Sequence, residues 1–104
     1  PKEFLPAKLL TDAGLISQAD IEKVVDVTEK SSIKVGKKVL ATGAISETIL
    51  YTALRTYSLY KQGFISAEQA VTALKKTKSE NLTLDEALSK LGWIVPSRMQ
   101  WIWS

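Results

Sequence analysis

Four short stretches decide the fold of this chain: Gly14–Ser17, Gly43–Ser46, Gly63–Ser66 and Gly92–Val95, which read GLIS, GAIS, GFIS and GWIV. A glycine can adopt the left-handed conformation that ends a helix, and the apolar residue after it packs back on the last turn. The isoleucine then precedes the next helix, and the serine hydroxyl can accept a hydrogen bond from that helix's unpaired amides. Each stretch therefore predicts the end of one helix and the start of the next.

The spacing of these stretches indicates an internal duplication. The first and third glycines are separated by forty-nine residues, as are the second and fourth, whereas the second and third are only twenty apart. The repeating unit is thus a pair of helical hairpins, spanning about residues 4–54 and then 53–103. Because one such unit cannot bury its apolar face alone, we expect the two tandem double-hairpin repeats to share one core.

The predicted fold class is all-α, with about seven short helices. Capping signals and apolar periodicity place these helices over about residues 2–13, 17–29, 35–42 and 46–62, with three more starting at Ser66, Thr83 and Pro96. No segment alternates apolar and polar residues for long, as a β-strand would. A chain of 104 residues suits one domain, so we expect residues 1–104 to form a single helical domain.

The composition narrows the class of protein. Apolar residues make up 45% of the chain and charged residues 24%, values that are ordinary for a globular protein. No apolar run is long enough to span a bilayer, and the N-terminus lacks the layout of a signal peptide. We therefore expect no membrane insertion and a cytoplasmic location.

The residue types argue against catalysis. The chain has no histidine and no cysteine, which removes the commonest general base, the thiol nucleophile and most transition-metal ligands. The acidic residues Glu22, Asp26 and Glu29 follow the spacing of a solvated helix face, and Asp85 and Glu86 stand where a helix start favours negative charge. The sequence therefore predicts a protein that is not an enzyme and that has no metal site and no cofactor.

Two clusters of lysines are candidate binding sites. One cluster, at residues 75–78, is expected at a helix C-terminus, where cations offset the helix dipole. The other, Lys34, Lys37 and Lys38, is expected near a helix start, where positive charge is mildly unfavourable. An anion-binding or phosphate-binding role for Lys34 and Lys37 thus competes with simple surface solvation. The net charge of +3 is too small to predict a broad nucleic-acid footprint.

The aromatic residues gather in the fourth helix and at the C-terminus. Trp101 and Trp103 are two residues apart, so in a helix they cannot point the same way. One of them is expected to pack inside, while the other either forms a partner-binding surface or simply covers the fold. The expected surface, for a protein partner, uses Tyr60, Trp101 and Trp103 as apolar anchors with Arg55 and Lys61 as its polar rim.

The stretch 34–45, KVGKKVLATGAI, continued by Leu50 and Leu54, resembles the N-terminal domains of type II secretion and type IV pilus assembly ATPases, the MshEN family. Family members with the full motif twice bind cyclic di-GMP through an arginine and a glycine at the motif start and a glutamine at its end. Here Lys34 stands at the arginine position, Gly36 matches the glycine, and Tyr57 stands at the glutamine position.

The resemblance implies two expectations about function. The first is a non-catalytic protein-interaction or regulatory module of a larger bacterial signalling or secretion-type protein, which keeps the family's packing but not its full ligand motif. The alternative is a sensor that binds a cyclic dinucleotide or another phosphorylated ligand near Lys34, Gly36 and Lys37.

Overall fold

The computed structural model describes residues 3–93, which form α-helices and contain no β-strand, so the all-α prediction is confirmed for this range. The helices are α1 (Pro6–Asp12), α2 (Gln18–Glu22), α3 (Ser32–Ala41), α4 (Glu47–Lys61), α5 (Ala67–Glu80) and α6 (Leu84–Leu91). None of them combines the length and the apolar character needed to cross a bilayer. The helix expected from Pro96, with Trp101 and Trp103, lies outside the described residues.

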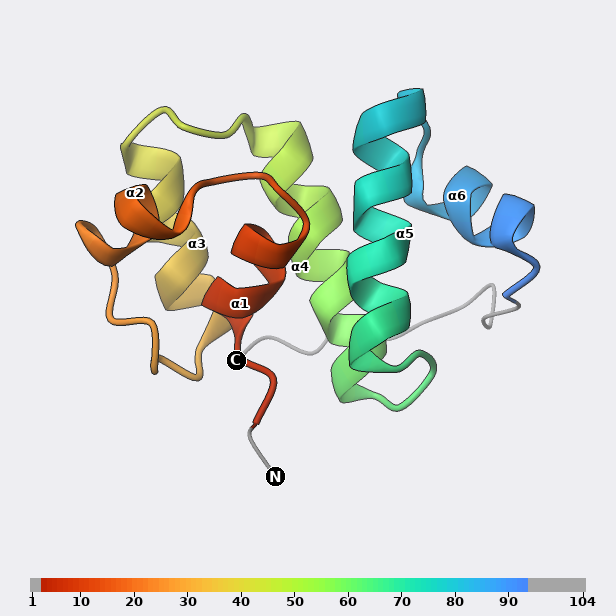
Figure 1. The fold of residues 1–104 in the computed structure, drawn as a ribbon, viewed down its shortest axis with the longest axis horizontal. Helices are drawn as coiled ribbons and strands as arrows, with labels where there is room; N and C mark the ends of the chain where they lie inside the picture. Colours follow the sequence, from red (N-terminus) through yellow and green to blue (C-terminus); the bar gives the residue numbers. More distant parts are fainter. Residues whose placement is uncertain (1–2, 94–104) are drawn as a thin grey trace.

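The long helices α4 and α5 form the centre of the molecule. Figure 1 shows them side by side, with α1, α2 and α3 packed on one side and α6 against the other side of α5. Leu59 of α4 and Leu74 of α5 are almost completely buried, as is Leu9 of α1, so the central pair shares one hydrophobic core with the N-terminal helices.

The helix ends follow the predicted glycine and serine pattern. The four turn glycines have φ values of 76°, 76°, 83° and 77°, at Gly14, Gly43, Gly63 and Gly92 respectively. The side chains of Ser17, Ser46 and Ser66 each accept a hydrogen bond from a backbone amide at the start of the next helix. The isoleucines that precede these serines, Ile16, Ile45 and Ile65, are buried. The fourth isoleucine, Ile94, lies outside the described range.

The second helix is shorter than predicted, because a local turn replaces its C-terminal half. We expected it to reach about Glu29, but α2 ends at Glu22. The carboxylate of Asp26 accepts hydrogen bonds from both the backbone amide and the hydroxyl of Thr28, at 2.9 and 2.6 Å. Aspartate competes with helical hydrogen bonding in this way, and the preceding pair of β-branched residues, Val24 and Val25, does not favour a helix.

Two other boundaries also differ from the prediction. The first helix begins at Pro6 rather than Lys2, since proline has no amide hydrogen to donate and is best placed in the first turn. The third helix begins at Ser32 rather than Val35, because the hydroxyl of Ser31 accepts the amide of Lys34 and acts as its cap. The lysine cluster consequently spreads along α3, with Lys38 in its last turn, instead of standing at its start.

Side-chain bonds hold α6 against the centre. Thr83 and Glu86 form a reciprocal capping box at its start. The guanidinium of Arg55 on α4 donates to both carboxylate oxygens of Asp85, at 2.8 and 3.2 Å. Near the other end of α6, Lys90 pairs with Glu80 of α5 at 3.4 Å. These contacts connect both ends of α6 to the two central helices.

Candidate functional site: a groove between α1 and α5

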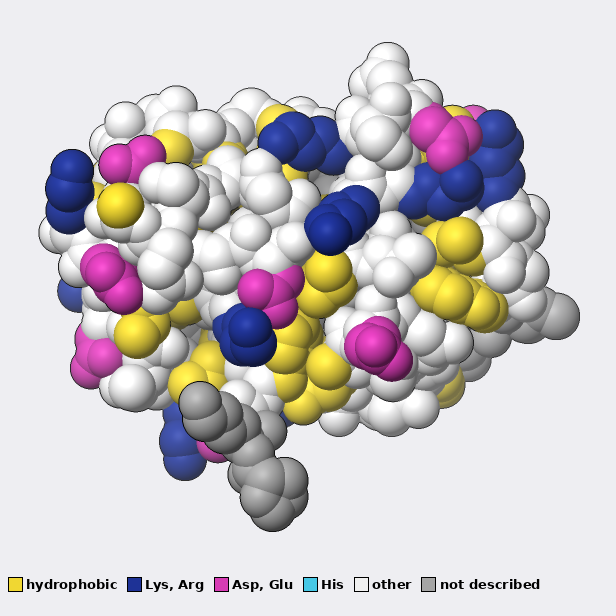
Figure 2. Space-filling model, in the orientation of Figure 1, with side chains coloured by type: hydrophobic (Ala, Val, Ile, Leu, Met, Phe, Trp, Pro, Cys, Tyr) yellow, Lys and Arg dark blue, Asp and Glu magenta, His cyan; other side chains and the backbone are white. Residues whose placement is uncertain are grey.

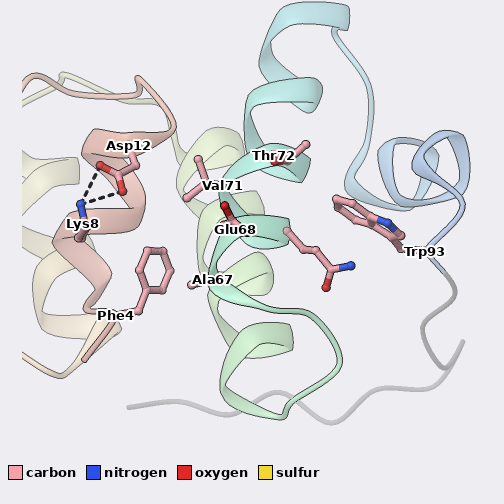
Figure 3. A pocket seen from close by; sticks show the side chains of 9 residues that line it. Phe4, Lys8, Asp12, Ala67, Glu68, Val71, Thr72 and Trp93 are labelled. Carbon is pink, nitrogen blue, oxygen red and sulfur yellow. Dashed lines mark hydrogen bonds and ion pairs between the residues drawn. The ribbon is translucent and has the colours of Figure 1, made fainter. Parts of the chain in front are cut away.

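A hollow of about 630 Å³ lies along α1 and α5. We call it the α1/α5 groove. Figure 2 shows hydrophobic side chains gathered between these two helices, with charged side chains around them. The residues that matter for its chemistry are Phe4, Lys8, Asp12, Glu68, Val71 and Trp93 (Figure 3).

Phe4 forms one wall of the groove because two tyrosines of α4 hold it there. Its ring meets the ring of Tyr60 edge to face, with centroids 5.0 Å apart, and lies 6.4 Å from the ring of Tyr57. The hydroxyl of Tyr57 donates a 3.0 Å hydrogen bond to the backbone carbonyl of Phe4. Burial raises the pKa of Tyr57 to about 12, so this phenol stays protonated and remains a donor at neutral pH. The wall is therefore preformed.

Val71 forms the opposite wall because it lies outside the buried stripe of α5. The core side of α5 carries Ala70, Ala73 and Leu74, which are fully buried. Val71 is one residue beyond Ala70, which turns it by about 100° around the helix axis, and it is only partly buried. Ala67 lies one turn before Val71 and lines the same groove. This face of α5 thus presents methyl groups to the groove.

Three charged side chains lie beside these apolar walls. The ammonium of Lys8 lies 3.0 Å from the carboxylate of Asp12, four residues later on α1. Glu68, exposed in the first turn of α5, lies near the middle of the groove in Figure 3. The three charges sum to minus one, so the groove has a weak preference for a partner that carries positive charge.

Trp93 lines the end of the groove that lies beyond α5. Its backbone amide donates to the carbonyl of Leu88 at 2.9 Å, which is the hydrogen bond that ends α6. Figure 3 shows the indole lying on the α6 side of α5, so that α5 stands between Trp93 and Phe4. An occupant that followed the whole groove would thus cross the exposed face of α5 and touch an aromatic ring on each side.

The lysines predicted to bind an anion do lie together, but with carboxylates. Lys34 and Lys37 line a second hollow, of about 230 Å³, together with Lys38, Asp26 and Glu29. Hydrogen bonds from Thr28 lower the pKa of Asp26, and the backbone amide of Ser31 lowers that of Glu29, so both carboxylates are ionised at neutral pH. Their negative charge offsets much of the positive charge that a phosphate group would require.

Gly36, the third residue of that predicted site, is not part of this hollow. It is buried, and a Cβ atom added to it would lie 3.1 Å from Cδ1 of Leu50 on α4. The glycine therefore serves the close approach of α3 and α4. The structure thus brings Lys34 and Lys37 together and places Gly36 on another side of α3.

The predicted partner-binding residues of α4 do not share one face. Tyr60 is five residues beyond Arg55 and Lys61 is six, which places the three side chains about 100–140° apart around the helix. Arg55 pairs with Asp85, Tyr60 packs on Phe4, and Lys61 is exposed. The remaining two predicted anchors, Trp101 and Trp103, lie outside the described residues.

Three residues of the groove were not among the sequence-based candidates for a binding site: Phe4, Val71 and Trp93. A signal for Val71 exists, because it is an apolar residue that lies off the core stripe of its helix. No comparable signal marks Phe4, because its position depends on α4, more than fifty residues away in the chain.

Within the part of the chain that the structure describes, no cluster of three or more acidic, histidine or cysteine side chains could hold a metal ion. Comparisons of this chain with protein-family models, with curated proteins and with solved structures found no match.

Proposed function

We propose that this chain is a non-catalytic protein-interaction module, and that its α1/α5 groove binds an apolar segment of a polypeptide. The proposal includes the setting expected from the sequence, in which the module regulates a larger bacterial signalling or secretion-type protein. The observation that carries it is the pairing of partly exposed aromatic and aliphatic walls, Phe4, Val71 and Trp93, with a few charged side chains beside them.

The shape of the groove favours a polypeptide over a small metabolite. Small-molecule sites enclose most of the ligand, whereas this groove runs openly over α1 and α5 (Figure 2). An amphipathic helix that lies on such a surface makes contact through residues three and four positions apart. Each leucine-sized or larger side chain that it buries would contribute about 1.5–3 kcal/mol.

The proposal can be tested without knowing the natural partner. A displayed library of amphipathic helical peptides is selected against the immobilised full chain, and the enriched peptides are then measured by calorimetry. We expect enriched peptides to bind the unmodified chain and to lose at least tenfold in affinity to Val71→Asp, because an aspartate would place an unpaired charge in the apolar wall.

The matched control is Ile49→Asp, which changes an equally apolar residue on α4 that is 38% exposed and lies outside the groove. Peptides that bind Val71→Asp and Ile49→Asp equally well, or a selection that enriches nothing, would contradict the proposal.

The proposal includes an internal duplication and a relationship to the MshEN family, and two features of the fold support them. With an offset of forty-nine residues, α2 (Gln18–Glu22) corresponds to the first turns of α5, and α3 (Ser32–Ala41) largely overlaps α6. The same turn conformation occurs at all four glycines. An MshEN-like domain that kept these hairpins and changed its ligand motif would have this combination of features.

A cyclic-dinucleotide sensor is the second candidate, and the clustering of Lys34, Lys37 and Lys38 around one hollow favours it. It ranks second because Asp26 and Glu29 line the same hollow. Titrating cyclic di-GMP by calorimetry tests it: heat that disappears in Lys34→Ala would support the sensor, and no heat at high ligand concentration would remove it.

A further inference from the structure

We propose that the partner of the α1/α5 groove is an amphipathic helix that lies antiparallel to α5, with an acidic residue near its N-terminus and a basic residue about two turns later. The inference rests on the proposed function, since it names the charge pattern and the direction of the segment that the groove binds. It starts from the charged residues on the exposed side of α5.

The exposed side of α5 carries opposite charges on either side of the apolar wall. Seven residues make almost two full turns, so Glu68 and Lys75 lie on the same side of α5, about 10.5 Å apart along its axis. Both are exposed, and the half-buried Val71 lies between them. In the direction of the chain, this side of α5 is therefore acidic, then apolar, then basic.

The fold neutralises neither of these two charges. Within residues 3–93, the side chains of Glu68 and Lys75 form no hydrogen bond and no ion pair. The other two charges of the groove, Lys8 and Asp12, pair with each other at 3.0 Å. A partner can thus place a basic group beside Glu68 and an acidic group beside Lys75 without breaking an existing pair.

The position of α1 directs an occupant along α5. Phe4, just before α1, lines the groove together with Ala67 in the first turn of α5 (Figure 3). Just beyond the other end of α1, the carbonyl of Gly14 accepts a 2.6 Å hydrogen bond from the ammonium of Lys78, near the end of α5. Because α1 follows α5 in this way, a helix held between them lies along α5.

The helix dipoles select one of two possible directions. An acidic-first helix running antiparallel to α5 would match its charges, and so would a basic-first helix running parallel to it. The antiparallel arrangement brings together helix ends of opposite partial charge. An acidic residue near its N-terminus and a basic one near its C-terminus also stabilise the partner helix itself.

The selection of helical peptides on the unmodified full chain gives the first test. We expect the enriched peptides to carry an acidic residue, apolar residues three and four positions later, and a basic residue seven positions after the acidic one. Enrichment of basic-first peptides instead would overturn the proposed direction.

Double-mutant cycles, measured by calorimetry on one enriched peptide, give the second test. Glu68→Gln and neutralising the peptide's basic residue should each weaken binding about two- to fivefold, and the two changes together should weaken it no further than one alone. The same should hold for Lys75→Gln and the peptide's acidic residue. Lys37→Gln, at an exposed lysine of α3 outside the groove, is the matched control and should couple to neither.

The cycles separate the failure of this inference from the failure of the proposed function. Peptides that lose affinity to Val71→Asp but couple to neither Glu68 nor Lys75 would support the binding function and refute the charge pattern. Coupling of the basic residue to Lys75→Gln rather than to Glu68→Gln would also refute it. A selection that enriches no peptide would refute the binding function itself.

A second copy of the chain is the competing occupant. Self-association of the unmodified chain in sedimentation, abolished by Val71→Asp but kept by Ile49→Asp, would assign the groove to that copy and overturn the inference. The selection and the sedimentation of the unmodified chain both stay decisive even if a variant fails to fold.

Discussion

At the scale of single residues, the glycines of this chain meet two different physical needs. Gly43, like the other three turn glycines, has a positive φ, and a Cβ atom added to it would meet nothing within 4 Å. Gly36 has the opposite constraint, because its conformation is helical and Leu50 of α4 occupies the space beside it. The first kind of glycine is required by the backbone, and the second by helix packing.

We therefore expect Gly43→Ala to lower the free energy of unfolding by about 1–2 kcal/mol, through backbone strain alone. Gly43→Asn should cost less, because asparagine tolerates the left-handed region better than alanine does. Urea unfolding of the two variants measures both values. If Gly43→Ala proved as stable as the unmodified chain, the assigned role of this turn would be wrong.

The bond from Tyr57 to Phe4 leads to a second prediction. Tyr57→Phe removes a 3.0 Å hydrogen bond from a partly buried carbonyl and should cost about 0.5–1.5 kcal/mol. Urea unfolding measures this loss, and a Tyr57→Phe variant as stable as the unmodified chain would contradict the role of the bond.

The same tyrosine should make the fold sensitive to strong base. The pKa of Tyr57 is raised by burial from 10.0 to about 12, so the folded state holds this proton more tightly than the unfolded state. The stabilisation that comes from this proton is fully present below the pKa of the unfolded state. It is lost as the pH rises through the pKa of the folded state. The urea midpoint of the unmodified chain should decrease as the pH rises from 10.0 to about 12. The midpoint of Tyr57→Phe should decrease less steeply over the same pH range. Equal slopes in the two proteins would contradict the assignment.

At the scale of elements, α5 and α6 begin with reciprocal capping boxes, at Ser66–Gln69 and Thr83–Glu86. Thr83→Ala should lower the free energy of unfolding by about 0.5–2 kcal/mol, because it leaves an amide of the first turn without its acceptor. Ser89→Ala provides the control, since it removes an exposed hydroxyl from the same helix at a position that does not cap it. Measured by urea unfolding, equal losses in the two variants would argue against the cap.

The α6 box also predicts how the fold responds to acid. Hydrogen bonds from the backbone amide and the hydroxyl of Thr83 lower the pKa of Glu86 below its usual 4.5. A carboxylate whose pKa is lowered by folding stabilises the fold at pH values above its pKa in the unfolded state. This stabilisation is lost as the pH falls through its pKa in the folded state. The urea midpoint should therefore decline below pH 4.5, and Glu86→Gln, which keeps an acceptor but does not titrate, should flatten part of that decline. An identical decline in both proteins would refute the role of Glu86.

The element boundaries show how far the sequence alone determines the fold. The predicted span of α4 and the starts of α5 and α6 agree with the structure, because Ser46, Ser66 and Thr83 cap the first turns of these helices. Gly43 and Gly63 also mark the turns before α4 and α5. The prediction for α2 was wrong because it continued the helix capped by Ser17 through Asp26 to about Glu29, whereas α2 ends at Glu22. The bond from Thr28 to Asp26 is a local alternative that periodicity does not reveal.

At the scale of the whole molecule, the candidate site was the least predictable feature. The α1/α5 groove joins residues from both ends of the described chain, and its wall at Phe4 depends on two tyrosines of α4. Sequence spacing identified the lysines of α3 as neighbours, since they share one helix. It could not show that Asp26 and Glu29 would line the same hollow, because that juxtaposition depends on the unpredicted turn after α2.

The arrangement of α4 and α5 makes a last prediction about cooperativity. Leu59 of α4 is completely buried, and α4 packs against α3 and α1 as well as α5, so the described helices share one core. Leu59→Ala should cost about 2–5 kcal/mol, and the chain should keep one unfolding transition, with tryptophan fluorescence and circular dichroism coinciding. Ile49→Ala, at a partly exposed position of the same helix, should cost far less. Two separate transitions would contradict this prediction, because they would mean that α1 and α5 belong to parts of the chain that unfold independently.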